Sequence, residues 1–325
     1  MKISDIGFRL AKRMVRVASM AQEVQAAARS TAVSKSDASP ITIADLAVQI
    51  AVTSMLSDEL GSFRLVGEEN SDILRQPGSE GLAESVITAL HTVDVRLSVK
   101  QALDILDLGR FEPGPADSYW VLDPIDGTKG FLRGDQYAIA LAEIHEGSVT
   151  KGILACPMLN VCGRQGGYAI AERGSGSWVL DESGHLVPIG VSSTVSAENA
   201  RFCESVESGH SSHEWSKRVA EELGIDNEPL RLDSQAKYLA LAAGQADIYL
   251  RLPVRGDYVE KVWDHAAGSI IVEEAGGVVS DCRGVPLDFV GTRVLCNNSG
   301  VVVATPGLHA RVIEAIKAGR PKAGH

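Results

Sequence analysis

Apolar residues recur every three or four positions over residues 1–28, which predicts an amphipathic helix that begins behind Ser4. A polar, serine-rich stretch interrupts this pattern, and a second helix is expected to begin near Thr42 with Asp45 in its first turn. The apolar run at 63–66 then predicts a strand. Two further helices are expected near residues 79–91 and 98–108.

The pattern changes at Tyr119 to short apolar runs that are separated by glycine-bearing turns. Such runs predict strands that pair with their neighbours along the chain, so the middle third of the protein is expected to form an antiparallel meander. The predicted strands lie at residues 119–122, 137–144, 150–156, 167–171 and 177–180.

Strands and helices alternate beyond residue 192, which predicts an α/β half packed against a first, α+β half. The chain is therefore divided into two expected domains, residues 1–191 and residues 192–325, with no repeat or long flexible linker between them. In the second half, strands are expected near 201–203, 247–252 and 303, and helices near 212–223, 235–243, 264–274 and 307–317.

Composition and charge narrow the class of protein. Of 325 residues, 45% are hydrophobic and 22% charged, as in ordinary globular proteins, and the net charge of −11 disfavours nucleic acid polymers and anionic membrane surfaces as partners. Five scattered cysteines predict a reducing compartment without a disulfide framework. No apolar run approaches the ~18–20 residues that span a bilayer, and the first residues lack the pattern of a secretory signal, so a cytoplasmic location is expected.

The densest candidate site is the hexapeptide 123–128, Asp-Pro-Ile-Asp-Gly-Thr, which directly follows an apolar run. Asp123 and Asp126 can point into one small volume, where both stay ionised only beside a positive charge. Oxygen ligands without a neighbouring histidine or cysteine favour a hard cation such as Mg²⁺. The alternative is a turn in which an aspartate caps the next element and Gly127 supplies an unusual backbone angle.

Three further carboxylates stand at the ends of predicted apolar elements, where active sites are assembled. Glu68 follows a strand, with a solvated loop acid as its alternative reading. Asp264 opens a predicted helix, and Asp45 lies near the start of another, so a cap or an interaction with the helix dipole is the default explanation for each.

The chain resembles the inositol monophosphatase superfamily of lithium-sensitive, magnesium-dependent phosphomonoesterases in three motifs that occur in the expected order. Within that superfamily it looks like the 3′(2′),5′-bisphosphate nucleotidases, and the likeness runs from about Ser39 to Val303. It implies a layered αβαβα sandwich of two sheets with flanking helices. The three motifs are 67–69, 123–128 and 263–268, and the branch is indicated by 129–131, 207–213, 233–238 and 250–253.

The resemblance also implies a role for individual residues, with most metal ligands in the first domain and the nucleotide-binding residues in the second. It places two or three Mg²⁺ ions on Glu68, Asp123, the backbone carbonyl of Ile125, Asp126 and Asp264. It implies that Asp45 and Thr128 orient and deprotonate the attacking water. It places the substrate on Thr128, His210, Ser234, Lys237, Arg251 and Asp264. Asn70 stands where the family often has an aspartate.

Each predicted substrate residue has a plainer interpretation. His210 is a lone histidine, Ser234 sits where it could cap the next helix, and Lys237 could lie on the wet face of that helix. Arg251 is harder to explain in this way, because it interrupts an apolar strand where a long cation needs a partner. An arginine and a lysine near a helix N-terminus are typical of a phosphate site.

The implied activity is hydrolysis of the 3′-phosphate of adenosine 3′,5′-bisphosphate (PAP) to AMP, together with conversion of its sulfated relative PAPS to APS, which would connect the protein to sulfate assimilation. Inositol phosphates or fructose 1,6-bisphosphate are the alternative substrates on the same core. A non-catalytic binding protein is the third possibility, although none of the expected acids is missing. The pattern leaves the oligomeric state open. Part of the acidic surplus is then explained as a metal site counted without its metal.

Overall fold

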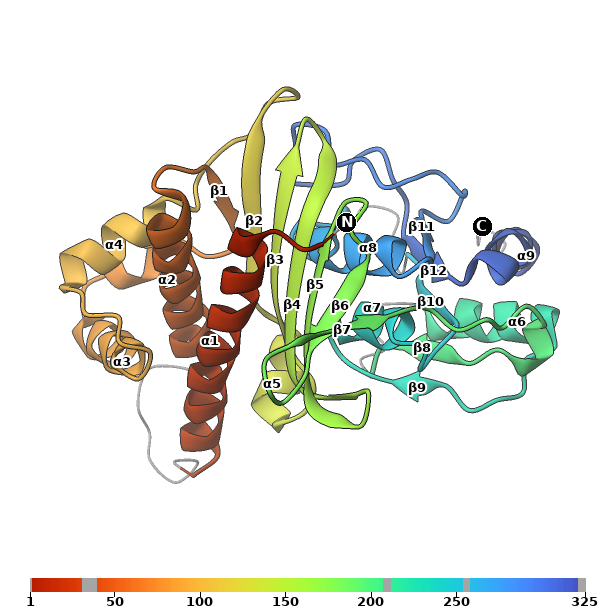
Figure 1. Ribbon diagram of the computed structural model, residues 1–325, viewed down its shortest axis with the longest axis horizontal. Helices are drawn as coiled ribbons and strands as arrows, with labels where there is room; N and C mark the ends of the chain where they lie inside the picture. The colour runs from red at the N-terminus through yellow and green to blue at the C-terminus, as the bar shows by residue number, and fades with distance from the viewer. Residues whose placement is uncertain (1, 31–39, 207–211, 254–257, 321–325) are drawn as a thin grey trace.

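Five alternating layers of helices and strands make up the molecule, as the side-by-side arrangement in Figure 1 shows. This computed structural model describes residues 2–30, 40–206, 212–253 and 258–320. Helices α1 and α2 cover one face of a seven-stranded sheet, α7 and α8 lie between that sheet and a five-stranded one, and α6 and α9 form the outer layer. The predicted αβαβα sandwich is therefore confirmed.

The seven-stranded sheet follows the order of the chain from β1 to β7. β1 pairs in parallel with β2 and every later pair is antiparallel, so the predicted meander is confirmed. Two differences are that β2 continues through the acidic hexapeptide and that β7 was not predicted. The strands are β1 Leu65–Gly67, β2 Ser118–Asp126, β3 Ala138–His145, β4 Ser148–Val161, β5 Arg164–Glu172, β6 Ser177–Leu180 and β7 Leu186–Ile189.

The helices on the outer face of this sheet are α1 (Asp5–Ser30) and α2 (Pro40–Leu60), with α3 (Glu80–His91) and α4 (Val99–Asp107) beyond them. Ser4 caps α1 as predicted, since its Oγ accepts the Gly7 N–H at 3.1 Å. The prediction for α2 is wrong in its start. The helix begins at Pro40, so Asp45 lies beyond the first turn and neither caps the helix nor meets its dipole.

The second sheet has the order β11-β12-β10-β8-β9. β8 pairs in parallel with β9 and β10, whereas β12 pairs antiparallel with β10 and β11. Of its strands, β9 and β11 were not predicted, because each is only two or three residues long. The strands are β8 Phe202–Glu204, β9 Leu230–Arg231, β10 Ile248–Arg251, β11 Val278–Ser280 and β12 Val301–Ala304.

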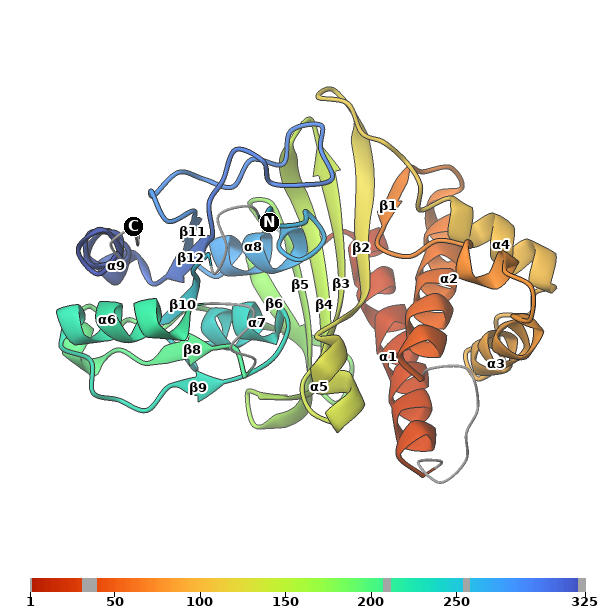
Figure 2. The same cartoon turned by 180° about the vertical axis from the view of Figure 1, so that it is seen from behind.

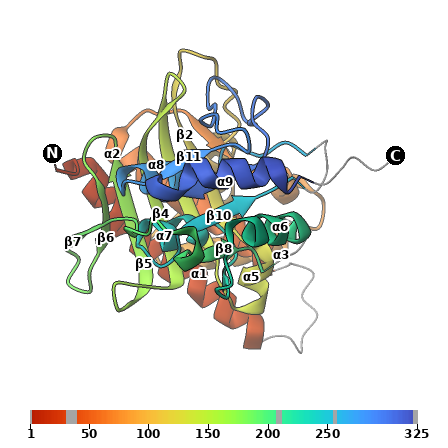
Figure 3. The same cartoon turned by 90° about the vertical axis from the view of Figure 1, so that its right-hand side faces the viewer.

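Helices α7 (Ala236–Ala242) and α8 (Ala266–Glu274) are buried between the two sheets, which the view from behind makes plain (Figure 2). α8 begins two residues later than predicted, and its first turn is preceded by His265, so Asp264 does not cap it. α6 (His213–Leu223) and α9 (Pro306–Ala318) lie over the outer face of the five-stranded sheet (Figure 3). The short elements are α5 Thr128–Arg133, which was not predicted, η1 Ile73–Arg75 and η2 Ala197–Asn199.

One apolar core joins the two halves of the chain, because residues of β3, β4 and β5 pack directly against α7 and α8. Gly152 in β4 permits the closest approach, since a Cβ there would come within 2.8 Å of the Ala267 carbonyl. The domain boundary at residue 191 stays a prediction. Across the described ranges, no helix has both the length and the apolar character needed to cross a bilayer.

Candidate active site

A cavity of about 670 Å³ opens where β2, β10 and the N-terminal ends of α5, α7 and α8 come together. Both halves of the chain line it, which brings side chains more than a hundred residues apart to one place. Its walls include most of the residues predicted from the sequence: Glu68, Asp123, Ile125, Asp126, Thr128, Ser234, Lys237, Arg251 and Asp264. Asp45 is not in the lining, and His210 lies outside the described residues.

A bulge near the end of β2 turns its two aspartates toward this cavity. Asp123 pairs with Ala140 and Asp126 with Ala138, so two residues of β2 stand opposite the single residue Ile139 of β3. One of the two is Pro124, which has no N–H to donate to a ladder. The bulge thus leaves backbone groups of Pro124 and Ile125 outside the regular pairing, as a carbonyl ligand at Ile125 would require.

Gly127 separates the strand from helix α5 and is required there for two reasons. Its φ of 89° lies in the left-handed region, where a side chain would be strained. In addition, a Cβ at this position would come within 2.9 Å of the Cβ of Ser234. This tight turn places Thr128 at the start of α5, on the wall of the cavity.

Asp123 has the chemistry of a metal ligand without its metal. Its side chain is only 2% exposed, and its Oδ1 has no hydrogen-bond partner. Burial raises the pKa of Asp123 well above its usual value, and the charges of Glu68 and Asp126 act in the same direction. A buried carboxylate with an unpaired oxygen, beside other carboxylates, fits a hard divalent cation with oxygen ligands.

Glu68 reaches the same cavity because β1 and β2 are parallel, so their carboxyl ends lie at one edge of the sheet. The Glu68 N–H donates to the Leu122 carbonyl at 3.2 Å, which holds Glu68 level with Asp123. Although its side chain is open to solvent in the cavity, desolvation by the surrounding protein and the charge of Asp264 raise the pKa of Glu68 to about 7.

Asp126 lies between the acids and the cations. Burial and the charge of Asp264 raise its pKa, while the nearby charge of Lys237 acts against that rise. One carboxylate oxygen, Oδ2, accepts the backbone N–H of Gln235 at 2.5 Å. Asp126 thus connects the end of β2 to the loop that precedes α7.

Asp45 is buried behind the acidic cluster and does not face the cavity. Burial, together with the charges of Glu69 and Glu68, raises its pKa to about 9. Thr128 is exposed on the cavity wall, and no hydrogen bond between Asp45 and Thr128 occurs in the described part of the chain. The joint action of this pair in activating water stays a prediction.

Lys237 is a buried cation, with only 4% of the residue exposed, so the plainer alternative of a wet helix face is wrong. Its Nζ donates to the Leu232 carbonyl at 3.3 Å and lies 5.3 Å from the centre of the Tyr249 ring. Burial lowers the pKa of Lys237, although the carboxylate of Asp126 opposes that shift. Ser234, at φ 63°, accepts the Ala236 N–H on its Oγ at 3.2 Å, although Gln235 rather than Ser234 is the N-cap residue of α7.

Arg251 has the partners that an arginine in an apolar strand requires. Its Nε lies 2.9 Å from Oε2 of Glu260, and its terminal nitrogen lies 3.5 Å from Oδ2 of Asp264. Burial alone would lower its pKa, but the surrounding negative charge, that of Glu260 foremost, holds the pKa well above its usual value. Arg251 therefore stays charged beside a predicted metal ligand.

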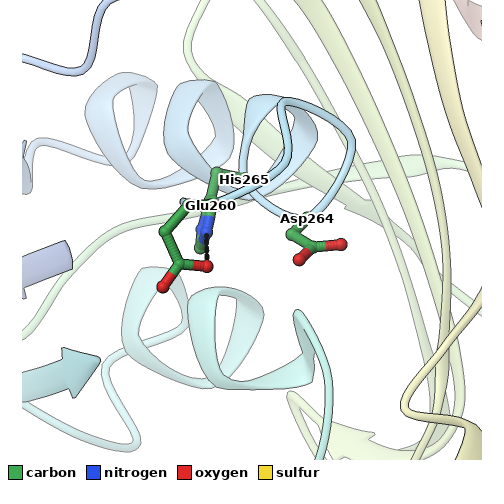
Figure 4. Close-up of side chains that lie close together, drawn as sticks. All are labelled: Glu260, Asp264 and His265. Carbon is green, nitrogen blue, oxygen red and sulfur yellow. Dashed lines mark hydrogen bonds and ion pairs between the residues drawn. The ribbon is translucent and has the colours of Figure 1, made fainter. Parts of the chain in front are cut away.

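Glu260, Asp264 and His265 form a group whose ligand atoms lie within 4.8 Å of one another (Figure 4). Both nitrogens of His265 are engaged, Nε2 with Oε2 of Glu260 at 3.1 Å and Nδ1 with the hydroxyl of Tyr238 at 2.8 Å. Figure 4 shows the Asp264 carboxylate directed away from that pair. We interpret Glu260 and His265 as a hydrogen-bonded support and Asp264 as the group available to a cation.

Two residues that the sequence patterns did not single out hold the loop of Glu68. Gln49, fully buried in α2, accepts the Glu69 N–H at 3.0 Å and donates to the Glu69 carbonyl at 2.5 Å. Arg293 donates to the Gly67 carbonyl at 2.9 Å and lies 5.3 Å from the centre of the Trp263 ring. The only sequence signal was that Gln49 lies one helical turn after Asp45.

Comparison with known proteins defines the class to which this fold and site belong. The model of the inositol monophosphatase family matches residues 3–319, and the chain belongs to that family. Among solved structures, extragenic suppressor protein suhB from Bartonella henselae has a TM-score of 0.61 at 19% identity, covering 96% of this chain and 99% of that one. At such low identity this likeness shows the fold.

Within the family, the chain is similar to proteins named 3′(2′),5′-bisphosphate nucleotidase. The one from Schizosaccharomyces pombe is 42% identical over 90% of this chain and 88% of its own. 3′(2′),5′-bisphosphate nucleotidase 1 of Arabidopsis thaliana is 42% identical over 92% of both chains. The resemblance and the assignment to the phosphatases that were predicted from the motifs are confirmed.

Proposed function

We propose that the protein is a magnesium-dependent phosphatase that removes the 3′-phosphate of PAP to give AMP, and that it also converts PAPS to APS. The observation that carries this proposal is one cavity in which acids from both halves stand opposite Lys237 and Arg251. The names of the similar nucleotidases support the nucleotide as substrate.

The cation would be held by Glu68, Asp123, Asp126 and Asp264, with the Ile125 carbonyl as a further ligand. Two or three Mg²⁺ ions in this position would lower the pKa of water and compensate the charge of the phosphate. All donors are oxygens, which suits Mg²⁺ better than zinc or copper. Oδ1 of buried Asp123 has no hydrogen-bond partner among the described residues, which supports a ligand at this point.

The residues of this chain supply positioning and proton transfer. Thr128 presents its hydroxyl at the cavity wall, where it orients the attacking water, and Asp45 is the group that takes up the proton. In the metal-free protein burial and the charges of Glu69 and Glu68 raise the pKa of Asp45 to about 9, so Asp45 holds a proton at neutral pH. A cation that compensates Glu68 would lower this pKa and leave the Asp45 carboxylate able to accept a proton. Its hydrogen bond to Thr128 would form in the complex with substrate.

The substrate phosphates would be bound on the opposite wall. Lys237 makes one hydrogen bond within the described residues, to the Leu232 carbonyl, although an ammonium has three donors. Arg251 offers a planar fork on the cavity wall. Ser234, His210, Thr128 and Asp264 complete the proposed contacts with the nucleotide. Because a buried ammonium is costly, a bound phosphate would compensate Lys237 as well as being held by it.

A phosphate-release assay with Mg²⁺ tests the proposal by comparing PAP, PAPS, AMP, inositol 1-phosphate, inositol 1,4-bisphosphate and fructose 1,6-bisphosphate. We expect PAP to have the highest kcat/KM. A preference for an inositol phosphate would move the chain to another branch of the family, and absence of hydrolysis would favour a binding protein.

The matched variant is Asp126→Asn, which removes a metal-binding oxygen with almost no change in volume. We expect loss of phosphate release with a folded protein, as judged by circular dichroism. Full activity of this variant on PAP would contradict the proposed metal site.

A further inference from the structure

Gln235 stands between the two acids that approach the cavity from different halves of the chain. It precedes helix α7 and is buried, with only 1% of its side chain exposed. A buried amide needs partners for both its oxygen and its nitrogen, because a buried polar group without a hydrogen bond is destabilising. The partners of Gln235 therefore indicate what it holds in place.

The side chain of Gln235 hydrogen-bonds to the backbone on both sides of Asp264. Its Nε2 donates to the carbonyl of Trp263, the residue before Asp264, at 2.9 Å. Its Oε1 accepts the N–H of Gly268, four residues after Asp264, at 3.0 Å. The Gly268 N–H is one of the first-turn donors of α8, which have no acceptor inside the helix. The residue before α8, His265, makes no capping bond with its side chain in the described part of the chain, so Gln235 supplies a cap from another element.

The backbone of the same residue holds the other acid, because the Gln235 N–H donates to Oδ2 of Asp126 at 2.5 Å. One residue thus bonds to Asp126 through its main chain and to the Asp264 turn through its side chain. Both acids line the cavity, one at the end of β2 and the other before α8. One buried glutamine therefore links the two acids through three hydrogen bonds.

We propose that Gln235 is a positioning residue that sets Asp264 at the correct distance from Asp126 to share a divalent cation. This inference rests on the proposed metal site, and it assigns a role to a residue that does not itself bind the cation. Residues that orient metal ligands typically change metal affinity or activity by about 10–100-fold when they are replaced.

The test measures binding of Mn²⁺ to the metal-free protein by electron paramagnetic resonance of the free ion, without substrate. Gln235→Met keeps the approximate volume and the backbone bond to Asp126 but removes both side-chain bonds. Gln235→Asn keeps the amide, yet is one methylene too short to reach Trp263 and Gly268 together. We expect Kd for Mn²⁺ to rise about tenfold or more in both variants, and either folded variant suffices for the test.

Gln25→Met is the matched control, because Gln25 is another buried glutamine whose Nε2 donates to a backbone carbonyl, that of Phe131, at 2.8 Å. We expect a loss of thermal stability but a Kd for Mn²⁺ within twofold of the unmodified protein. An equal rise in Kd in Gln25→Met would show a general effect of destabilisation and overturn the inference.

The other outcomes separate this inference from the proposed function. If the unmodified protein binds Mn²⁺ and the Gln235 variants bind it within twofold as tightly, the positioning role is wrong and the metal site stands. If the unmodified protein binds no Mn²⁺, the metal site itself is wrong and the inference falls with it. A large rise in Kd in a protein that hydrolyses an inositol phosphate rather than PAP would retain the positioning role and reject the nucleotide.

Discussion

Replacement of Gly268 by alanine tests the packing that brings α8 against α7. A Cβ at Gly268 would lie 2.4 Å from Cγ, 2.5 Å from Cδ2 and 2.8 Å from Cβ of Tyr238. These atoms form the root of the ring, which cannot swing away as the end of a flexible chain would. The ring is also held on other sides, by Tyr249 with ring centres 5.3 Å apart and by the bond from its hydroxyl to His265.

The expected effect of Gly268→Ala is a net loss of about 2 kcal/mol in the free energy of unfolding. Overpacking a core by one methyl group costs typically ~1–3 kcal/mol, and contacts as short as these favour the upper end of that range. Alanine in place of glycine in a helix raises the free energy of unfolding by about 1 kcal/mol, which offsets part of that loss. Because displacement of Tyr238 also disturbs His265, we expect weaker metal binding in addition.

Gly81→Ala in α3 provides the matched control, since no heavy atom lies within 4 Å of a Cβ there. The free energy of unfolding should stay unchanged or rise by up to ~1 kcal/mol. Both variants are compared with the parent by urea denaturation in EDTA. The packing of α8 against Tyr238 would be refuted if Gly268→Ala were as stable as Gly81→Ala and bound Mn²⁺ equally well.

Two further predictions concern the charges of the cavity. Lys237→Met keeps the apolar stem but removes the ammonium. It should raise KM for PAP about 10–100-fold, as expected for loss of a charge-assisted bond, and should change KM for inositol 1-phosphate much less. Equal changes in KM for both substrates, measured by steady-state kinetics, would contradict a specific phosphate contact. The raised pKa of Glu68, about 7, means that the folded, metal-free protein keeps a proton that the unfolded chain releases above about 4.5. The free energy of unfolding contributed by this proton should therefore be lost as the pH rises from about 4.5 to 7. Glu68→Gln should reduce this pH dependence of the free energy of unfolding, measured by urea denaturation in EDTA. An unchanged pH dependence would contradict the raised pKa of Glu68.

Local sequence patterns were sufficient for the meander and for most helices, whereas the layered sandwich and the full set of site acids came from the resemblance to the family. Period and turn signals identified the meander and most helices, since those depend on neighbours along the chain. The predicted strand over 119–122 ends too early, because a proline inside 123–128 is typical of a turn. In the structure this proline lies in a bulge of β2 that turns Asp123 and Asp126 toward the cavity. The sequence pattern placed Asp45 in a first turn because the helix start at Pro40 falls in a serine-rich, polar context.

The supporting residues could not be predicted for a different physical reason. Gln49 and Gln235 bind backbone atoms 20 and 33 residues away, respectively, and no periodicity encodes such contacts. A wet helix face was the plainer alternative for Lys237 because a lysine is usually exposed, but α7 lies between two sheets, where every face is buried. Burial set by tertiary packing, rather than by propensity, thus decides which polar residues act in the site.

The proposed cation and phosphate sites share Asp264, which would make binding of the phosphate dependent on the metal. Without a cation, Arg251 is engaged by Glu260 at 2.9 Å and by Asp264 at 3.5 Å, within a protein of net charge −11. A phosphate would then meet acids on one wall and an arginine already paired on the other. A divalent cation bound to Asp264 would weaken the ion pair between Asp264 and Arg251 and would reverse the local charge. The cavity would then attract the anion that it repels in the metal-free protein. The acidic surplus therefore favours an order of events in which Mg²⁺ precedes the nucleotide.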